Sequence, residues 1–162
     1  MNKDFGFWFS GLCDGEACFG LRSANGKHTY PVPRFDLTLR DDDTPMLDMI
    51  QGTLGFGKVY ARKTTGYVNP QGYKSKGLST YVVWNKADCK VLADFLRQFP
   101  LRSKKKRDFE LWAEAADLWA SVELKGWKSR TGTINAEKHN VVLRLRELAT
   151  EIVKVRKYVS PN

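Results

Sequence analysis

Residues 34–40 alternate strictly between apolar and polar side chains. Phe35, Leu37 and Leu39 occupy the odd positions, and Arg, Asp, Thr and Arg occupy the even ones. Successive side chains of a β-strand point to opposite faces, so this alternation predicts a strand with one face in a core. Such strands are typical of an antiparallel sheet that is covered on one side only. We therefore expect helices on one face of the sheet and polar side chains on the other.

The remaining elements follow from apolar periodicity and from turn residues. Strands are predicted over residues 17–23, 34–40, 58–63 and 78–84. Helices are predicted over residues 3–14, 44–54, 85–99, 104–122 and 135–158. This order indicates an α+β fold with a four-stranded antiparallel sheet, helices on one face and extra C-terminal helices. A chain of 162 residues fits one domain, spanning residues 1–162.

Capping residues support several of these boundaries. Thr44 before Pro45 is expected to cap the second helix, and Gly55 is expected to end it. Asn85, three residues before an aspartate, is expected to cap the third. Asn25 and Gly26 predict a turn between the first two strands. The first helix is so rich in aromatic residues that we expect it to be buried on more than one face.

Basic residues are unevenly distributed along the chain. Lys and Arg outnumber Asp and Glu by 27 to 18, which gives a formal net charge of +9. Residues 17–35 and 49–87 contain no acidic residue, and both stretches fall in predicted strands and loops. The open face of the sheet is therefore predicted to be basic. Such a face favours a polyanionic partner, and nucleic acid is preferred over a membrane surface.

Other features indicate a soluble, intracellular protein without a membrane partner. No run of about 18 apolar residues is present. The N-terminal residues do not have the features of a signal peptide. The three cysteines cannot all pair and none has C-x-x-C spacing, so we expect reduced thiols and no zinc site.

The segment 9–17, which contains Gly11-Leu-Cys-Asp14-Gly15-Glu16, resembles the LAGLIDADG signature in its G-L-x-D-G-E form. The resemblance continues through residues 35–39, 54–60 and 100–105. It implies the αββαββα-type LAGLIDADG fold. It also implies a homing endonuclease, of the kind carried by introns, that hydrolyses phosphodiester bonds in double-stranded DNA.

The resemblance also assigns catalytic roles. Glu16 matches the metal-binding acid of the family, and the backbone carbonyl of Gly15 would be a second ligand. The expected ion is Mg²⁺, with Mn²⁺ as a substitute, because carboxylate and carbonyl oxygens suit hard cations. The basic residue that the family places beside the scissile phosphate matches Lys104 or Lys105. Counting without gaps from Leu101 favours Lys104.

An ordinary core helix is the competing interpretation of residues 5–16. Gly11 and Gly15 would each weaken such a helix by about 1 kcal/mol relative to Ala. In the family, two motif helices pack side by side, which the small residues Ser10 and Gly11 would permit. Asp14 would then help to cap the crossed helix ends. Only one motif is present, so the resemblance implies a homodimer on a long, nearly palindromic site.

The side chains expected to face DNA come from strand alternation, from the family resemblance for the third strand, and from the acid-free stretches. They are Arg22, Lys27, Arg34, Asp36, Thr38, Arg40, Lys58, Tyr60, Arg62, Lys74, Lys76, Ser79 and Tyr81. On the fourth strand, Thr80, Val82 and Trp84 are expected to point the other way. In the major groove, Arg can pair with guanine, and Asp36 could accept a hydrogen bond from cytosine.

One position departs from the family pattern and keeps an alternative open. Many members carry Gln at the end of the second strand to order active-site water, and Leu39 stands here. Either a neighbour takes over that role or the activity is reduced. The alternative is a non-cleaving DNA- or RNA-binding protein of the same fold, an intron maturase or a regulator. Retention of Glu16 argues for the enzyme.

Overall fold

The order of the elements is the one that the sequence predicts. The computed structural model describes residues 2–23, 30–62, 70–72, 77–124 and 135–156. The elements are α1 (Lys3–Glu16), β1 (Ala17–Ser23), β2 (Pro31–Arg40), η1 (Asp41–Asp43), α2 (Thr44–Leu54), β3 (Lys58–Arg62), β4 (Leu78–Val83), α3 (Lys86–Gln98), α4 (Lys105–Ser121) and α5 (Ala136–Arg156). The predicted turn at Asn25 and Gly26 lies outside the described residues.

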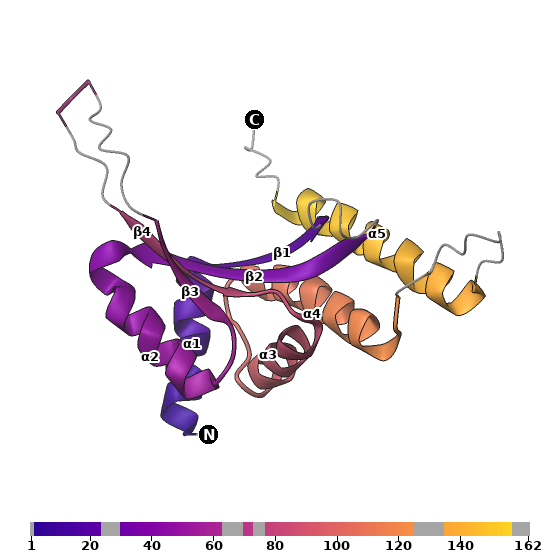
Figure 1. Cartoon of the computed structure of the whole chain (residues 1–162), viewed down its shortest axis with the longest axis horizontal. Helices are drawn as coiled ribbons and strands as arrows, with labels where there is room; N and C mark the ends of the chain where they lie inside the picture. Colours follow the sequence, from indigo (N-terminus) through magenta and orange to yellow (C-terminus); the bar gives the residue numbers. More distant parts are fainter. Residues whose placement is uncertain (1, 24–29, 63–69, 73–76, 125–134, 157–162) are drawn as a thin grey trace.

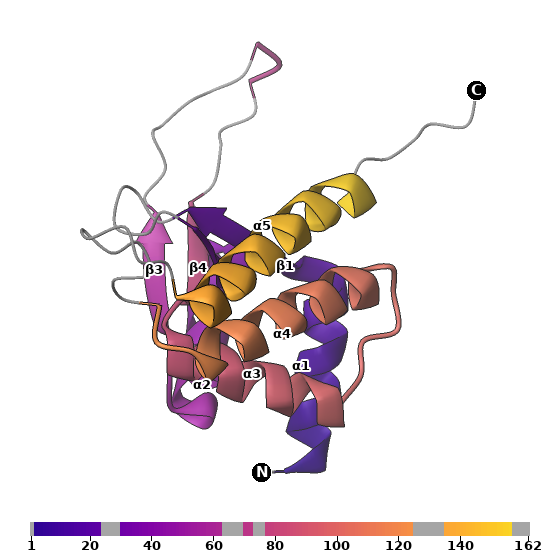
Figure 2. The ribbon, with the colours of Figure 1, turned by 90° about the vertical axis from the view of Figure 1, so that its right-hand side faces the viewer.

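The four strands form one antiparallel sheet in the order β1-β2-β4-β3. Phe35 of β2 pairs with Phe19 of β1, and Leu37 of β2 pairs with Tyr81 of β4. Residues that pair directly share a face of the sheet, so this register determines which side chains enter the core. Helices α1 to α4 lie against one face, and α5 packs on α4 and against β1 and β2 (Figures 1 and 2). The α+β prediction is confirmed.

The core lies between the sheet and the helices. Phe19 contacts Phe35, Phe109 and Trp112, with ring centroids 5.3, 5.4 and 5.6 Å away. Phe9 of α1 joins this cluster through Phe35, at 6.3 Å. The aromatic residues of α1, β1, β2 and α4 thus form one continuous apolar layer under the sheet. Among the described helices, none combines the length and the apolar character that a membrane crossing requires.

The fourth strand faces opposite to the prediction. Ser79 and Tyr81 are both 0% exposed. The Tyr81 hydroxyl donates a hydrogen bond to the Phe56 carbonyl at 2.9 Å, and its ring meets that of Phe35. The open face instead carries Leu78, Thr80, Val82 and Trp84. Both sides of this strand are partly apolar, so hydrophobicity did not decide between them. Pairing with β2 determines the orientation of the strand, and Ser79 and Tyr81 do not lie on the open face of the sheet.

The ends of the helices follow the predicted caps with one exception. Gly55 ends α2 in the left-handed conformation, with φ of 78°. Asn85 caps α3, because its side chain accepts a hydrogen bond from the Asp88 N–H at 2.9 Å. Thr44 is not the N-cap of α2, which is Asp43. Thr44 is the first helical residue instead, and its hydroxyl donates to the Asp41 carbonyl at 2.8 Å.

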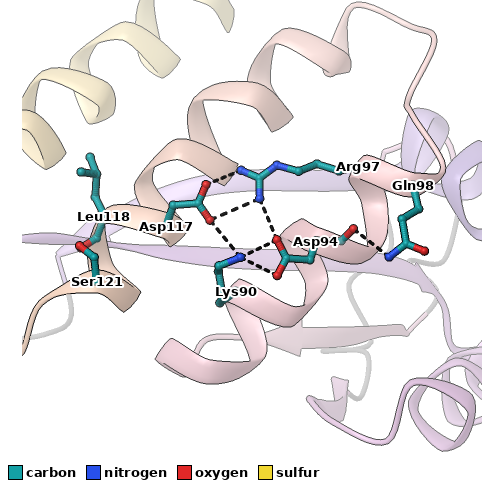
Figure 3. A network of polar contacts seen from close by, with 7 residues as sticks. All are labelled: Lys90, Asp94, Arg97, Gln98, Asp117, Leu118 and Ser121. Carbon is teal, nitrogen blue, oxygen red and sulfur yellow. Dashed lines mark hydrogen bonds and ion pairs between the residues drawn. The ribbon is translucent and has the colours of Figure 1, made fainter.

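A network of charged side chains joins α3 and α4 on the helical side of the molecule (Figure 3). Arg97 donates to Asp94 at 2.9 Å and to Asp117 at 2.5 Å. Lys90 donates to Asp94 at 2.5 Å. These side chains are substantially exposed, so each pair stabilises the fold only modestly.

Candidate functional site

The end of α1 is joined to the start of α4 through Asp14. Its carboxylate accepts hydrogen bonds from the N–H groups of Arg102, at 2.8 Å, and Ser103, at 3.0 Å. Burial opposes ionisation of Asp14, but these hydrogen bonds and the charge of Lys105 outweigh it and lower the pKa of the carboxyl. Asp14 therefore caps a turn of its own chain. Capping of two crossed motif helices, the role that the family resemblance implies for Asp14, involves a second chain and stays a prediction.

Lys105 is the lysine that reaches the motif. Its ammonium nitrogen donates to the Gly15 carbonyl oxygen at 2.5 Å. Lys105 is the first residue of α4, and its N–H donates to the Ser103 hydroxyl at 3.1 Å. Lys104 precedes the helix and is exposed. The count that favoured Lys104 is not supported, because Asp14 and Ser103 hold the turn so that Lys105 extends toward α1.

The oxygens at the end of α1 suit a divalent cation. Glu16 is exposed and is the last residue of the helix, directly after Gly15. The C-terminal end of a helix carries a partial negative charge, which favours a cation there. The ammonium group on the Gly15 carbonyl shows that this oxygen accepts a positive partner. Within the described residues no three His, Cys, Asp or Glu side chains could hold a metal ion together.

One face of α1 is left uncovered within a single chain. Phe7 and Trp8 are 57% and 40% exposed, and they share this face with Gly11. A Cβ atom added at Gly11 would meet nothing within 4 Å. Ser10 is only 4% exposed and belongs to the core side with Phe9. The assignment of Ser10 to an exposed interface is wrong, because helical spacing groups residues 7, 8 and 11 and turns residue 10 inward.

The open face of the sheet carries several of the charged residues that were predicted there. Arg34 and Arg22 both contact Asp36, at 2.8 and 3.4 Å. Thr38 and Thr80 hydroxyls are 3.0 Å apart across β2 and β4.

Toward the end of β2 and on β3, the same face continues with further polar groups. Arg40 bonds Asp42 at 2.9 Å, and Lys58 and Tyr60 are exposed on β3. Leu39 is packed against the core. Lys27, Lys74 and Lys76 lie outside the described residues, as does the side chain of Arg62.

Trp84 is a residue of this face that the sequence interpretation missed. The Arg34 guanidinium carbon lies 5.7 Å from the centroid of the Trp84 ring, and the centroids of the Trp84 and Tyr60 rings are 5.8 Å apart. Trp84 lies directly opposite Arg34, because the neighbouring residues Phe35 and Val83 are paired. The sequence carried one usable signal. Alternation along residues 78–84 puts Trp84 on the same face as Val82, and the pairing of Val82 with Asp36 makes this the open face.

The fold and the site define a class of protein. The family model described as "LAGLIDADG endonuclease" matches residues 9–116, and the chain belongs to this family. A curated relative, "Probable intron-encoded endonuclease Cox1-I1b" of Schizosaccharomyces pombe, is 27% identical over 139 residues. The match covers 83% of this chain but 33% of that protein, so the chain spans about a third of the relative's length.

Solved structures share the fold. The archaeal intron-encoded homing endonuclease I-Vdi141I, complexed with DNA, matches with a TM-score of 0.68 and 21% identity over 99% of this chain and 90% of its own. The homing endonuclease I-CvuI matches with a TM-score of 0.66 and 13% identity, over 99% and 87% of the two chains. The meganuclease I-AabMI, bound to uncleaved DNA, matches with a TM-score of 0.62 and 24% identity, over 92% of this chain and 44% of that one.

Proposed function

We propose that this protein is a metal-dependent endonuclease that cuts double-stranded DNA at a specific site as a homodimer. One observation carries the proposal. At the end of α1 the Lys105 ammonium group contacts the Gly15 carbonyl oxygen, and the exposed Glu16, the last residue of that helix, follows Gly15 directly in the chain. A carboxylate and a carbonyl oxygen can hold a divalent ion, and a nearby ammonium group can stabilise negative charge on a phosphate, and both contributions favour phosphodiester hydrolysis. The DNA complexes among the similar folds support the same activity.

A second copy of the chain would complete the site. Phe7 and Trp8 leave an apolar face of α1 exposed, and burying it would add about 25 cal/mol for each Å² removed from water. Gly11 lies on the same face and lets two helices approach closely. Pairing two α1 helices through this face would bring two Glu16 carboxylates together at the helix ends. We infer a twofold complex, which fits a nearly palindromic target.

Each group at the helix end has a distinct role in the proposed reaction. Glu16 and the Gly15 carbonyl would hold Mg²⁺, or Mn²⁺ in its place, which neutralises charge on the phosphate and activates water when bound. Lys105 places a positive charge beside the Gly15 carbonyl oxygen and can stabilise the negative charge that develops on the phosphate. Asp14 holds the turn that orients Lys105.

The open face of the sheet is the proposed DNA surface. Arg22, Arg34, Thr38, Arg40, Lys58, Tyr60 and Arg62 come from the strands, and Lys27, Lys74 and Lys76 come from the segments that connect them. A twisted antiparallel sheet can enter the major groove, where each base pair presents a distinct set of donors and acceptors. Lysines and arginines on such a face displace counterions, so the affinity should fall steeply as salt increases.

The test is cleavage of a randomised duplex library in Mg²⁺, followed by sequencing of the ends. Glu16→Gln keeps the size of the side chain and removes the charge that holds the ion. We expect DNA binding to persist and the cleavage rate to fall at least about 100-fold. Glu137→Gln, an exposed glutamate in the first turn of α5, is the matched control and should cut at the wild-type rate.

Two outcomes would contradict the proposal. Wild-type cutting by Glu16→Gln would remove Glu16 from the catalytic site. A wild-type protein that binds one duplex sequence but never cuts it would establish the maturase or regulator alternative, for which intron RNA should be tested as a partner.

A further inference from the structure

Asp36 lies in the middle of the open face and is held by two arginines. The Arg34 Nε donates to both carboxylate oxygens, at 2.8 and 3.0 Å, and its Nη2 lies 2.8 Å from Oδ1. The Arg22 Nη2 lies 3.4 Å from Oδ2. Asp36 is only 9% exposed. Its oxygens are thus already occupied by cations of the same chain, which makes the carboxylate a poor acceptor for a cytosine amino group.

Arg34 is supported from a second direction by an aromatic ring. Its guanidinium carbon lies 5.7 Å from the centroid of Trp84, within the range of a cation–π interaction. The Trp84 ring in turn packs beside Tyr60 of β3 at 5.8 Å. Side chains from β2 and β3, together with the residue that follows β4, therefore hold one guanidinium group in a defined place.

The contacts leave one edge of the Arg34 guanidinium available. The side edge, made by Nε and one N–H of Nη2, faces Asp36. The end edge consists of N–H groups on Nη1 and Nη2, which lie side by side in the rigid guanidinium plane. Two parallel donors of this kind match the O6 and N7 acceptors of guanine in the major groove. A side chain already held in place loses less entropy on binding than a free one.

We propose that Arg34 selects a guanine in the target, and that Asp36 and Trp84 are positioning residues that aim it. Asp36 acts on the sequence preference through Arg34 and does not contact a base. This inference rests on the proposed DNA-binding function and adds to it the base and the residues that determine one position of specificity.

The experiment compares base preferences of variants by selection from a randomised duplex library in Ca²⁺. Ca²⁺ should permit binding with little cutting because its coordination geometry is looser. Asp36→Asn is compared with Asp94→Asn, the aspartate between Lys90 and Arg97 on α3 (Figure 3). Each substitution removes one negative charge beside two cations, so Asp94→Asn tests whether the loss of such a charge away from the open face changes the base preference.

We expect Asp36→Asn to reduce the preference for guanine at one position of each half-site about tenfold, with preferences elsewhere unchanged. Trp84→Leu and Arg34→Lys should weaken the preference at the same position. Asp94→Asn should keep the wild-type profile. Circular dichroism establishes that each variant is folded, and Trp84→Leu, a substitution of an exposed ring, tests the same position if Asp36→Asn does not fold.

Three results would overturn the proposal, and they are distinguishable. Unchanged guanine preference in folded Asp36→Asn and Trp84→Leu would show that neither residue aims Arg34. If Asp36→Asn loses the preference at a base pair where Arg34→Lys keeps it, Asp36 contacts a base directly and does not act through Arg34. A wild-type protein that enriches no duplex sequence would refute the DNA-binding function itself.

Discussion

The Lys105 ammonium nitrogen lies 2.5 Å from the Gly15 carbonyl oxygen, although 90 residues separate them in the chain. The contact depends on Asp14, which binds the two N–H groups of the turn before α4. The Gly15 carbonyl and the Lys105 ammonium group are therefore brought together by Asp14, an acidic residue that is not itself a proposed metal ligand. Four measurements test this arrangement and its surroundings.

Replacing the lysine at this contact should impair catalysis more than binding. Lys105→Ala should lower the cleavage rate about 100-fold, a loss typical of removing one donor from a developing oxyanion. Lys104→Ala removes the same charge one residue earlier and should cost less than about tenfold. Single-turnover cleavage with saturating protein separates the chemical step from binding. Equal effects of the two substitutions would mean that the lysines contribute only through general attraction to DNA.

Removing the charge of Asp14 should destabilise the fold and change its response to acid. The pKa of this carboxyl is lower in the folded protein than its usual value. Its contribution to stability is therefore complete above the unfolded pKa of about 4 and is lost as the pH falls through the folded pKa. Asp14→Asn should reduce the unfolding free energy by about 1–2 kcal/mol at pH 7 and less at pH 2. Urea denaturation at both pH values provides the measurement. An identical loss at both would argue against a role for the ionised carboxylate.

A large side chain at Gly11 should weaken self-association without disturbing the core of the chain. A Cβ there meets nothing within 4 Å in one molecule, and the same holds for Gly52 of α2. Gly11→Leu should raise the dimer dissociation constant by at least about tenfold, and Gly52→Leu should leave it unchanged. Sedimentation equilibrium measures both. Wild-type protein that stays monomeric at micromolar concentration, with and without DNA, would refute the homodimer.

Gly57 should tolerate no side chain. Its φ is 77°, and an added Cβ would lie 2.5 Å from the Tyr81 ring. Gly57→Ala should therefore lower the unfolding free energy by about 2–4 kcal/mol, from backbone strain and overpacking together. Gly72→Ala, with φ of 80° and nothing within 4 Å, should show the smaller loss due to the backbone alone. Equal losses in urea denaturation would mean that the Tyr81 ring moves aside at little cost.

Local patterns in the sequence predicted most of the fold. The alternation at residues 34–40 and the caps at Asn85 and Gly55 act over a few residues, so their outcome depends little on the rest of the chain. The first helix was predicted over residues 3–14 and ends two residues later, at Glu16. The basic character of the strands could be predicted without knowledge of distant contacts, because it follows from the acid-free stretches of the sequence.

Tertiary pairing decided what local patterns left ambiguous. Both faces of residues 78–84 are partly apolar, so only pairing with β2 buries Tyr81 and exposes Trp84. Packing of α1 on the core turns Ser10 inward. Asp14 binds the turn before α4, which is about 90 residues away in the chain. That contact brings Lys105, and not Lys104, to the Gly15 carbonyl. In each case the free energies of two local arrangements are similar, and a contact between distant segments determines which one the chain adopts.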